Sequence, residues 1–394
     1  MSLTVSKPKR IASIDVFRAL TMFLMIFVND LWSITEVPHW LEHAASNEDM
    51  LGLSDIVFPA FLFIMGMSIP MAIEGRIKRG ESRLVISKHI VIRSIALLIM
   101  GLFTVNTEYG ILQSTGLSKS VFVIIMLIGF FLIWNVYPPS DDKNRKRLYL
   151  VLKIVGWCIL IVLALLYRDS NGGIFQPRWW GILGLIGWTY LICAGIYLFV
   201  RNNVIGLIAA NFLFILLCIS GVSGWLGAFR GIIPSDGCFH AFTMSGLLLS
   251  LVFNRFSDKY TMPQKLSSAV IAGVLFLVAG CLAHMCWIIS KIQATPTWLF
   301  FCTGISILFY IFIYWLADIR GKANWFDIIK PAGTATLTCY LVPYLLYAVF
   351  TLVNLQLPAV ITTGGIGILK CIVFSFVTIG ITALLNRGGV KLKI

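Results

Sequence analysis

Long apolar runs alternate with short polar stretches along almost the whole sequence. About twelve of these runs approach or exceed the ~20 residues that a helix needs to cross the hydrocarbon core of a bilayer. They cover residues 11–33, 53–75, 89–106, 119–137, 149–167, 180–200, 204–226, 239–256, 266–289, 298–317, 331–353 and 365–386. The pattern predicts an all-α polytopic membrane bundle of about twelve helices, forming one integral-membrane domain over residues 1–394.

Composition and charge support this interpretation. Hydrophobic residues make up 59% of the chain and charged residues 12%, against about 25% charged residues in soluble domains. On alternate connections the predicted topology places 22 Lys and Arg residues on one side and five on the other. Because cationic loops stay cytoplasmic, both termini are expected inside, with 1–10 as a cytoplasmic tail. The net charge of +14 then reflects topology, and no nucleic-acid partner is expected.

The first predicted helix carries a polar and methionine stripe. Asp15, Arg18, Met22, Met25 and Asn29 follow one another at spacings of three and four, which places them on one helical face. Asp15 and Arg18 can form an ion pair, and a purely structural pair is the alternative to a functional one. Asn29 lies about 21 Å further along the axis, so the stripe runs from the inner mouth to the outer mouth.

The outer loop 34–54 holds two histidines, His39 and His43, and Asp55 follows at the start of the second helix. A histidine can take a proton from an acceptor hydroxyl or amine near neutral pH. Asp55 is either a helix N-cap or a carboxylate that orients His43. A zinc site would use the two histidines, but a third ligand at suitable spacing is missing, and the nine cysteines contain no Cys-x-x-Cys pair. No metal is therefore expected.

Two further sets of residues are candidates for binding. The first is a set of cations at the inner side: Arg76, Lys78, Arg79, Arg83 and Arg93. Either membrane topology alone explains these cations, or they bind the phosphates of a cytosolic donor together with Asp15 and Arg18. The second lies in the outer half and would contact an acceptor: His39, His240, His284, Thr297 and Trp298. The alternative is a solvated loop side chain for His39 and buried structural side chains for the others.

The segment from Arg10 to Pro70 resembles the transmembrane acyltransferase family typified by heparan-α-glucosaminide N-acetyltransferase. The matching stretches are Ser13–Leu20, Phe27–Asn29, His43–Ala45 and Asp55–Gly66. The resemblance implies acetyl-CoA as the donor, bound from the cytosol, and a sugar acceptor on the far side. It also implies His43, Asn29 and Asp55 as the catalytic residues. Residues 119–167 would be a two-helix insertion into a ten-helix core, in a bacterial branch of the family located in the inner membrane.

Two other classes of function remain open from the sequence. A sugar or glycan transporter or permease also fits twelve helices, and so does an assembly subunit without catalysis. The acceptor, the choice between N- and O-acetylation, a relay through an acetylated His43 and the formation of a homodimer are equally open.

Overall fold

The computed structural model describes residues 12–111, 116–254 and 260–394, and the predicted tail 1–10 lies outside these ranges. Within them the regular elements are helices, accompanied by two isolated β-bridges. The helices are α1 (Ala12–Asp30), α2 (Leu53–Lys78), α3 (Arg83–Glu108), α4 (Lys119–Trp134), α5 (Lys143–Leu166), α6 (Ile182–Val200), α7 (Val204–Val222), α8 (Cys238–Asn254), α9 (Met262–His284), α10 (Pro296–Tyr314), α11 (Lys330–Thr334), α12 (Thr336–Leu352) and α13 (Gly364–Arg387).

The predicted multi-pass helical bundle is confirmed. Within the described residues, ten helical segments are long and apolar enough to cross a membrane, and the bent pair formed by Ala323–Thr334 and α12 makes up to eleven. The remaining run, α4, is a shorter apolar helix of 16 residues. It ends at Trp134 instead of 137, because the chain turns extended at Asn135, which forms a β-bridge with Leu392.

The predicted single run 331–353 is broken in the structure. Its two halves meet at an angle of 76°, and Ala335 at the break has φ −129° and ψ 46°. A Cβ on Gly333 would come within 2.8 Å of the carbonyl oxygen of Asp15, so only glycine lets the break lie this close to α1. The hydropathy of the sequence could not predict the break, because it depends on this close approach between two helices.

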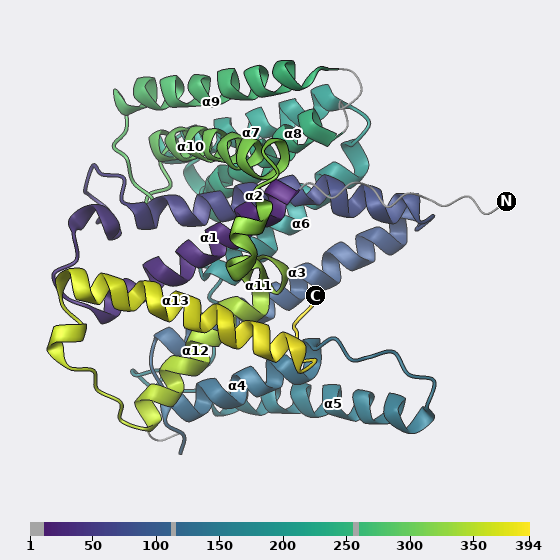
Figure 1. Ribbon diagram of the computed structural model, residues 1–394, viewed down its shortest axis with the longest axis vertical. Helices are drawn as coiled ribbons and strands as arrows, with labels where there is room; N and C mark the ends of the chain where they lie inside the picture. Colours follow the sequence, from purple (N-terminus) through teal and green to yellow (C-terminus); the bar gives the residue numbers. More distant parts are fainter. Residues whose placement is uncertain (1–11, 112–115, 255–259) are drawn as a thin grey trace.

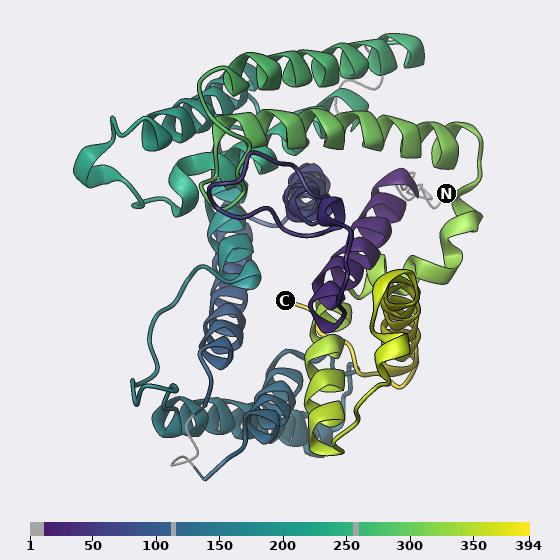
Figure 2. The same ribbon diagram turned by 90° about the vertical axis from the view of Figure 1, so that its left-hand side faces the viewer.

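The helices form a wide bundle with α1 near its centre (Figure 1). Helices α7 to α10 lie at one end of the long axis, and α4 and α5 lie at the other. Figure 2 shows α1 and α12 on one side of the molecule and α3 and α6 on the other. A close seam joins α2 and α8: a Cβ on Gly66 would collide with the backbone of Thr243, and one on Gly246 with that of Phe63. Small residues give such close contact in membrane bundles.

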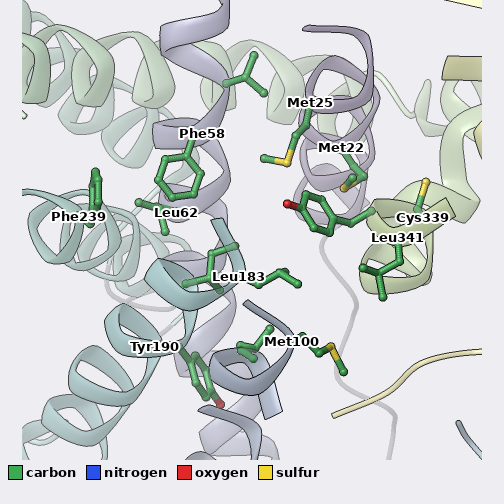
Figure 3. Packing of buried hydrophobic residues seen from close by; sticks show 14 of the residues in the cluster. Met22, Met25, Phe58, Leu62, Met100, Leu183, Tyr190, Phe239, Cys339 and Leu341 are labelled. Atoms are coloured by element: carbon green, nitrogen blue, oxygen red, sulfur yellow. The ribbon is translucent and has the colours of Figure 1, made fainter. Parts of the chain in front are cut away.

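Apolar side chains from several helices meet at the centre (Figure 3). Met22 and Met25 of α1 are 1% and 3% exposed, and they extend towards a region bordered by Phe58 of α2 and Leu183 of α6. We call the end of the bundle that carries the α1–α2 loop the outer end, after its predicted orientation, and the opposite one the inner end. The methionine stripe of α1 thus connects the two ends through the interior.

Candidate functional site

A histidine and a carboxylate are paired at the outer end. His43 Nδ1 lies 2.7 Å from Asp55 Oδ1, and the other carboxylate oxygen, Oδ2, accepts a hydrogen bond of 3.0 Å from the backbone N–H of Ala44. The N-cap of α2 is Gly52, so Asp55 lies in the first turn and uses its side chain for the loop. The carboxylate is 1% exposed and the imidazole 48%. The structure thus brings the predicted pair His43 and Asp55 together, in an arrangement that lets the carboxylate orient the imidazole.

Two buried side chains of α10 contact the backbone carbonyl of Asp55. Trp298 Nε1 donates to the carbonyl oxygen of Asp55 at 3.0 Å, and the thiol of Cys302 approaches the same oxygen. Trp298 is fully buried, and Thr297 uses its hydroxyl to donate to the carbonyl of Trp287 at 2.7 Å. Thr297 and Trp298, which were predicted to contact the sugar acceptor, are therefore buried beneath the site. Trp298 supports Asp55 there.

The third member of the cluster is Lys291, in the loop between α9 and α10. Its Nζ lies 3.1 Å from His43 Nδ1, 3.5 Å from His43 Nε2 and 3.8 Å from Asp55 Oδ1. Burial lowers the pKa of Lys291, and the neighbouring Asp55 carboxylate acts against this shift. In the sequence Lys291 is only one of five cations on the outer connections, and nothing local relates it to a loop 248 positions away.

The other outer histidines have separate partners. His39 contacts Glu48, which raises the pKa of His39, and His284 Nε2 lies 2.7 Å from Asp49 Oδ2. His240 is buried in α8 and stacks on Phe214 with ring centroids 5.0 Å apart. Across the described ranges, no group of three or more His, Cys, Asp or Glu side chains is placed to hold a metal ion.

Two adjoining cavities follow the stripe of α1. The inner cavity has a volume of about 480 Å³ and the outer one about 410 Å³. Both are lined by Met22, Met25, Ile182 and Tyr340, so the two cavities adjoin at these side chains. Arg18 lies in the wall of the inner cavity and Asn29 in that of the outer one, while Asp15 pairs with Arg18 at 3.3 Å. The predicted course of the stripe from one end to the other is confirmed.

Cations surround the inner cavity: Arg18, Arg93, Lys391 and Lys393. Arg18 donates to Ser68 Oγ at 2.6 Å, and the guanidinium of Arg93 lies 4.7 Å from the centre of the Tyr190 ring. Of the other predicted inner cations, Arg76 and Arg79 bind Glu81, and neither they nor Lys78 and Arg83 line this cavity.

The two lysines of the inner cavity belong to the C-terminal segment, which the structure fixes firmly. The backbone N–H of Lys391 donates to Asn135 Oδ1 at 2.8 Å, and that of Leu392 donates to Thr338 Oγ1 at 3.0 Å. Sequence reasoning missed both lysines as site residues, because their position at the end of the last helix is already explained by the preference of cations for the inner side.

Polar and aromatic side chains line the outer cavity: Asn29, Trp32, Thr104, Glu108, Tyr340, Tyr344 and Tyr347. Tyr347 donates to Asp30 Oδ1 at 2.7 Å, and Lys370 binds Asp30 Oδ2 at 2.8 Å. Within the described part of the chain, the Asn29 side chain makes no hydrogen bond and is exposed towards this cavity. His43, Asp55 and Lys291 line neither of the two cavities.

Fold and site together define a multi-pass membrane protein with two adjoining internal cavities and with ionisable groups at both ends of the bundle. The chain belongs to the family described as "Domain of unknown function (DUF5009)", whose model matches residues 10–221. It is also similar to two proteins named heparan-alpha-glucosaminide N-acetyltransferase. The Mus musculus protein is 34% identical over 149 residues, and the Homo sapiens protein is 32% identical over 175 residues. These matches cover 34% and 40% of this chain, but only 21% and 25% of the two relatives.

Proposed function

We propose that this protein is a membrane-embedded acetyltransferase that moves an acetyl group from cytosolic acetyl-CoA to an amine or hydroxyl of a sugar on the other side of the membrane. The observation that carries the proposal is the pair of adjoining cavities along α1, cationic at the inner end, together with the paired histidine and carboxylate at the outer end of the bundle. The names of the two relatives support the reaction class. We place the protein in the bacterial cytoplasmic membrane.

The inner cavity suits the donor. The nucleotide end of acetyl-CoA carries phosphates, and Arg and Lys are the side chains that recognise them. Arg18, Arg93, Lys391 and Lys393 would hold this end, while the flexible arm that bears the thioester extends along Met22 and Met25. A methionine wall suits an apolar arm, since the thioether side chain adapts to irregular shapes.

His43, Asp55 and Asn29 each take a different part in the transfer reaction. Nδ1 of His43 donates to Asp55, which leaves the lone pair on Nε2 to accept a proton. The acceptor nitrogen or oxygen forms a bond to the thioester carbonyl carbon, the carbon–sulfur bond breaks, and the proton passes through His43 to the leaving thiolate of CoA. The Asn29 amide would donate to the oxyanion, a contribution of about 3 kcal/mol in comparable sites. Because His43 lines neither cavity, the mechanism requires an acceptor bound in the outer cavity to extend from there to His43.

The outer cavity suits a sugar. Trp32 and the tyrosines of α12 offer flat apolar faces, and Asn29 and Glu108 offer hydrogen-bonding groups from α1 and α3. A small number of convergent polar groups within an apolar wall is typical of small-molecule sites.

The direct test is transfer of labelled acetyl from acetyl-CoA to a panel of amino and neutral sugars by the purified protein in detergent. We expect transfer by the wild type, and a loss of at least about 100-fold in the variant His43→Ala, because proton transfer by a positioned base contributes about 10²- to 10⁴-fold. Glu42→Ala is the matched control, since it changes the exposed neighbour of His43 and leaves the Asp55 contact intact.

Equal transfer rates in His43→Ala and the wild type would refute the role of this histidine. Absence of transfer in the wild type, together with sugar flux through liposomes in the absence of acetyl-CoA, would instead show a transporter.

A further inference from the structure

Two outer loops are fastened to each other beside His43. Asp49, in the α1–α2 loop, accepts a hydrogen bond of 2.8 Å from the backbone N–H of Ile289 in the α9–α10 loop. The carbonyl oxygen of Ser46 accepts from Ser290 Oγ at 3.1 Å and from Gln293 Nε2 at 2.7 Å. These contacts lie on both sides of Lys291 in the sequence. The position of the lysine next to the histidine is thus fixed by the backbone of its loop.

Lys291 acts on the imidazole chiefly through its positive charge. Nδ1 of His43 already donates its proton to Asp55, so it has no lone pair to offer to the ammonium group. The ammonium nevertheless lies within 3.5 Å of both ring nitrogens, and its side chain is only 25% exposed. Limited contact with water strengthens the effect of the ammonium on any charge that the ring acquires.

We propose that Lys291 is a positioning residue that keeps His43 neutral, and therefore able to accept a proton, at physiological pH. This inference rests on the proposed function, in which His43 is the general base. A positive charge beside the ring disfavours the imidazolium, whereas the Asp55 carboxylate favours it. Lys291 opposes Asp55, so that the carboxylate can orient the imidazole without making it permanently protonated.

The same charge assists the end of the reaction. Once His43 has taken the proton of the acceptor, the cluster holds two positive charges and one negative charge. Repulsion from Lys291 then favours passing the proton to the thiolate of CoA. The other ionisable groups near the cluster are Glu48, which interacts electrostatically with Asp55, and Cys302 of α10, which does so with Asp55 and Lys291.

The experiment compares pH–rate profiles of kcat/KM for wild type, Lys291→Met and Lys291→Arg. Without the ammonium the imidazolium is stabilised, so the acidic limb of the Lys291→Met profile should move to higher pH by about one unit. Its activity is then low at pH 7 and recovers at pH 9, while Lys291→Arg keeps the wild-type profile. Gln293→Ala weakens the loop contact without changing charge, and its rate should fall by the same factor at every pH.

A second readout does not depend on activity. Diethylpyrocarbonate reacts with neutral imidazole, and mass spectrometry of the peptide containing His43 gives its rate of modification. This rate should rise with pH later in Lys291→Met than in the wild type and Lys291→Arg; Lys291→Gln replaces the methionine variant if the latter does not fold.

The inference is overturned if Lys291→Met reduces the rate uniformly and leaves the modification profile unchanged. A wild type that transfers no acetyl at any pH would overturn the proposed function, and the modification profiles would then still decide the role of Lys291.

Discussion

The outer and inner ends of the bundle differ in how their cations are paired with carboxylates. At the outer end Lys291 lies 3.8 Å from Asp55, and Lys370 lies 2.8 Å from Asp30, which is fully buried. At the inner end, Arg93, Lys391 and Lys393 have no carboxylate within ion-pair distance in the described part of the chain, although all three line the cavity. Charges near lipid are costly unless they find a partner. The outer end thus supplies its own counter-charges. At the inner end Asp15 pairs with Arg18, and the other three cations are suited to an anion that arrives from outside the protein.

This difference suits the outer end to catalysis and the inner end to binding of the donor. A cluster that is internally paired keeps its geometry before any ligand arrives, as catalysis by positioned groups requires. A group of cations without internal counter-charge gains most when a polyanionic ligand enters. Changes at the outer end should therefore affect the rate of transfer, and changes at the inner end should affect the affinity for the donor.

The largest effect is expected for Asp55→Asn. The amide is close in shape to the carboxylate but no longer favours the tautomer with the proton on Nδ1. In a comparable catalytic triad this change lowers kcat by about 10⁴-fold, and we expect a loss of about 10³-fold or more here. Steady-state kinetics at saturating acetyl-CoA measure it, with KM for the donor unchanged. A loss below tenfold would show that Asp55 only supports the fold.

A smaller effect is expected at the inner end, for the double variant Lys391→Gln and Lys393→Gln. Its KM for acetyl-CoA should rise about tenfold, the equivalent of about 1.4 kcal/mol. Its kcat should remain near that of the wild type. With acetyl-pantetheine, which lacks the nucleotide phosphates, wild type and variant should behave alike.

The matched control is Lys143→Gln with Lys146→Gln, two exposed lysines at the start of α5. Equal changes of KM for both donors, or a rise in this control pair, would remove the distinction between the two ends.

Local pattern was sufficient to predict part of the site. The spacing of Arg18, Met22, Met25 and Asn29 predicted a shared face, and the structure places these side chains in the walls of two adjoining cavities. The pairing of His43 with Asp55 was also predicted, across only 12 positions of sequence. A helical period and a short loop are both local features.

The rest of the site depends on tertiary packing. Lys291 reaches His43 across 248 positions, and Lys391 reaches the cavity through a bridge to the end of α4. Trp298 was predicted to contact the acceptor, but it lies against Phe242 and supports Asp55. No periodicity encodes these contacts. For the same reason the hydropathy pattern predicted the helices but not the break at Ala335.

The central claim is that an acetyl group crosses the membrane through this protein, and sidedness in proteoliposomes tests it most directly. The wild type is reconstituted with an amino sugar sealed inside the vesicles, and labelled acetyl-CoA is supplied only outside. For the fraction of molecules whose inner end faces outwards, the account predicts labelled acetyl sugar inside the vesicles and free CoA outside, and no product with His43→Ala. Product that forms only when donor and sugar share one compartment would contradict it.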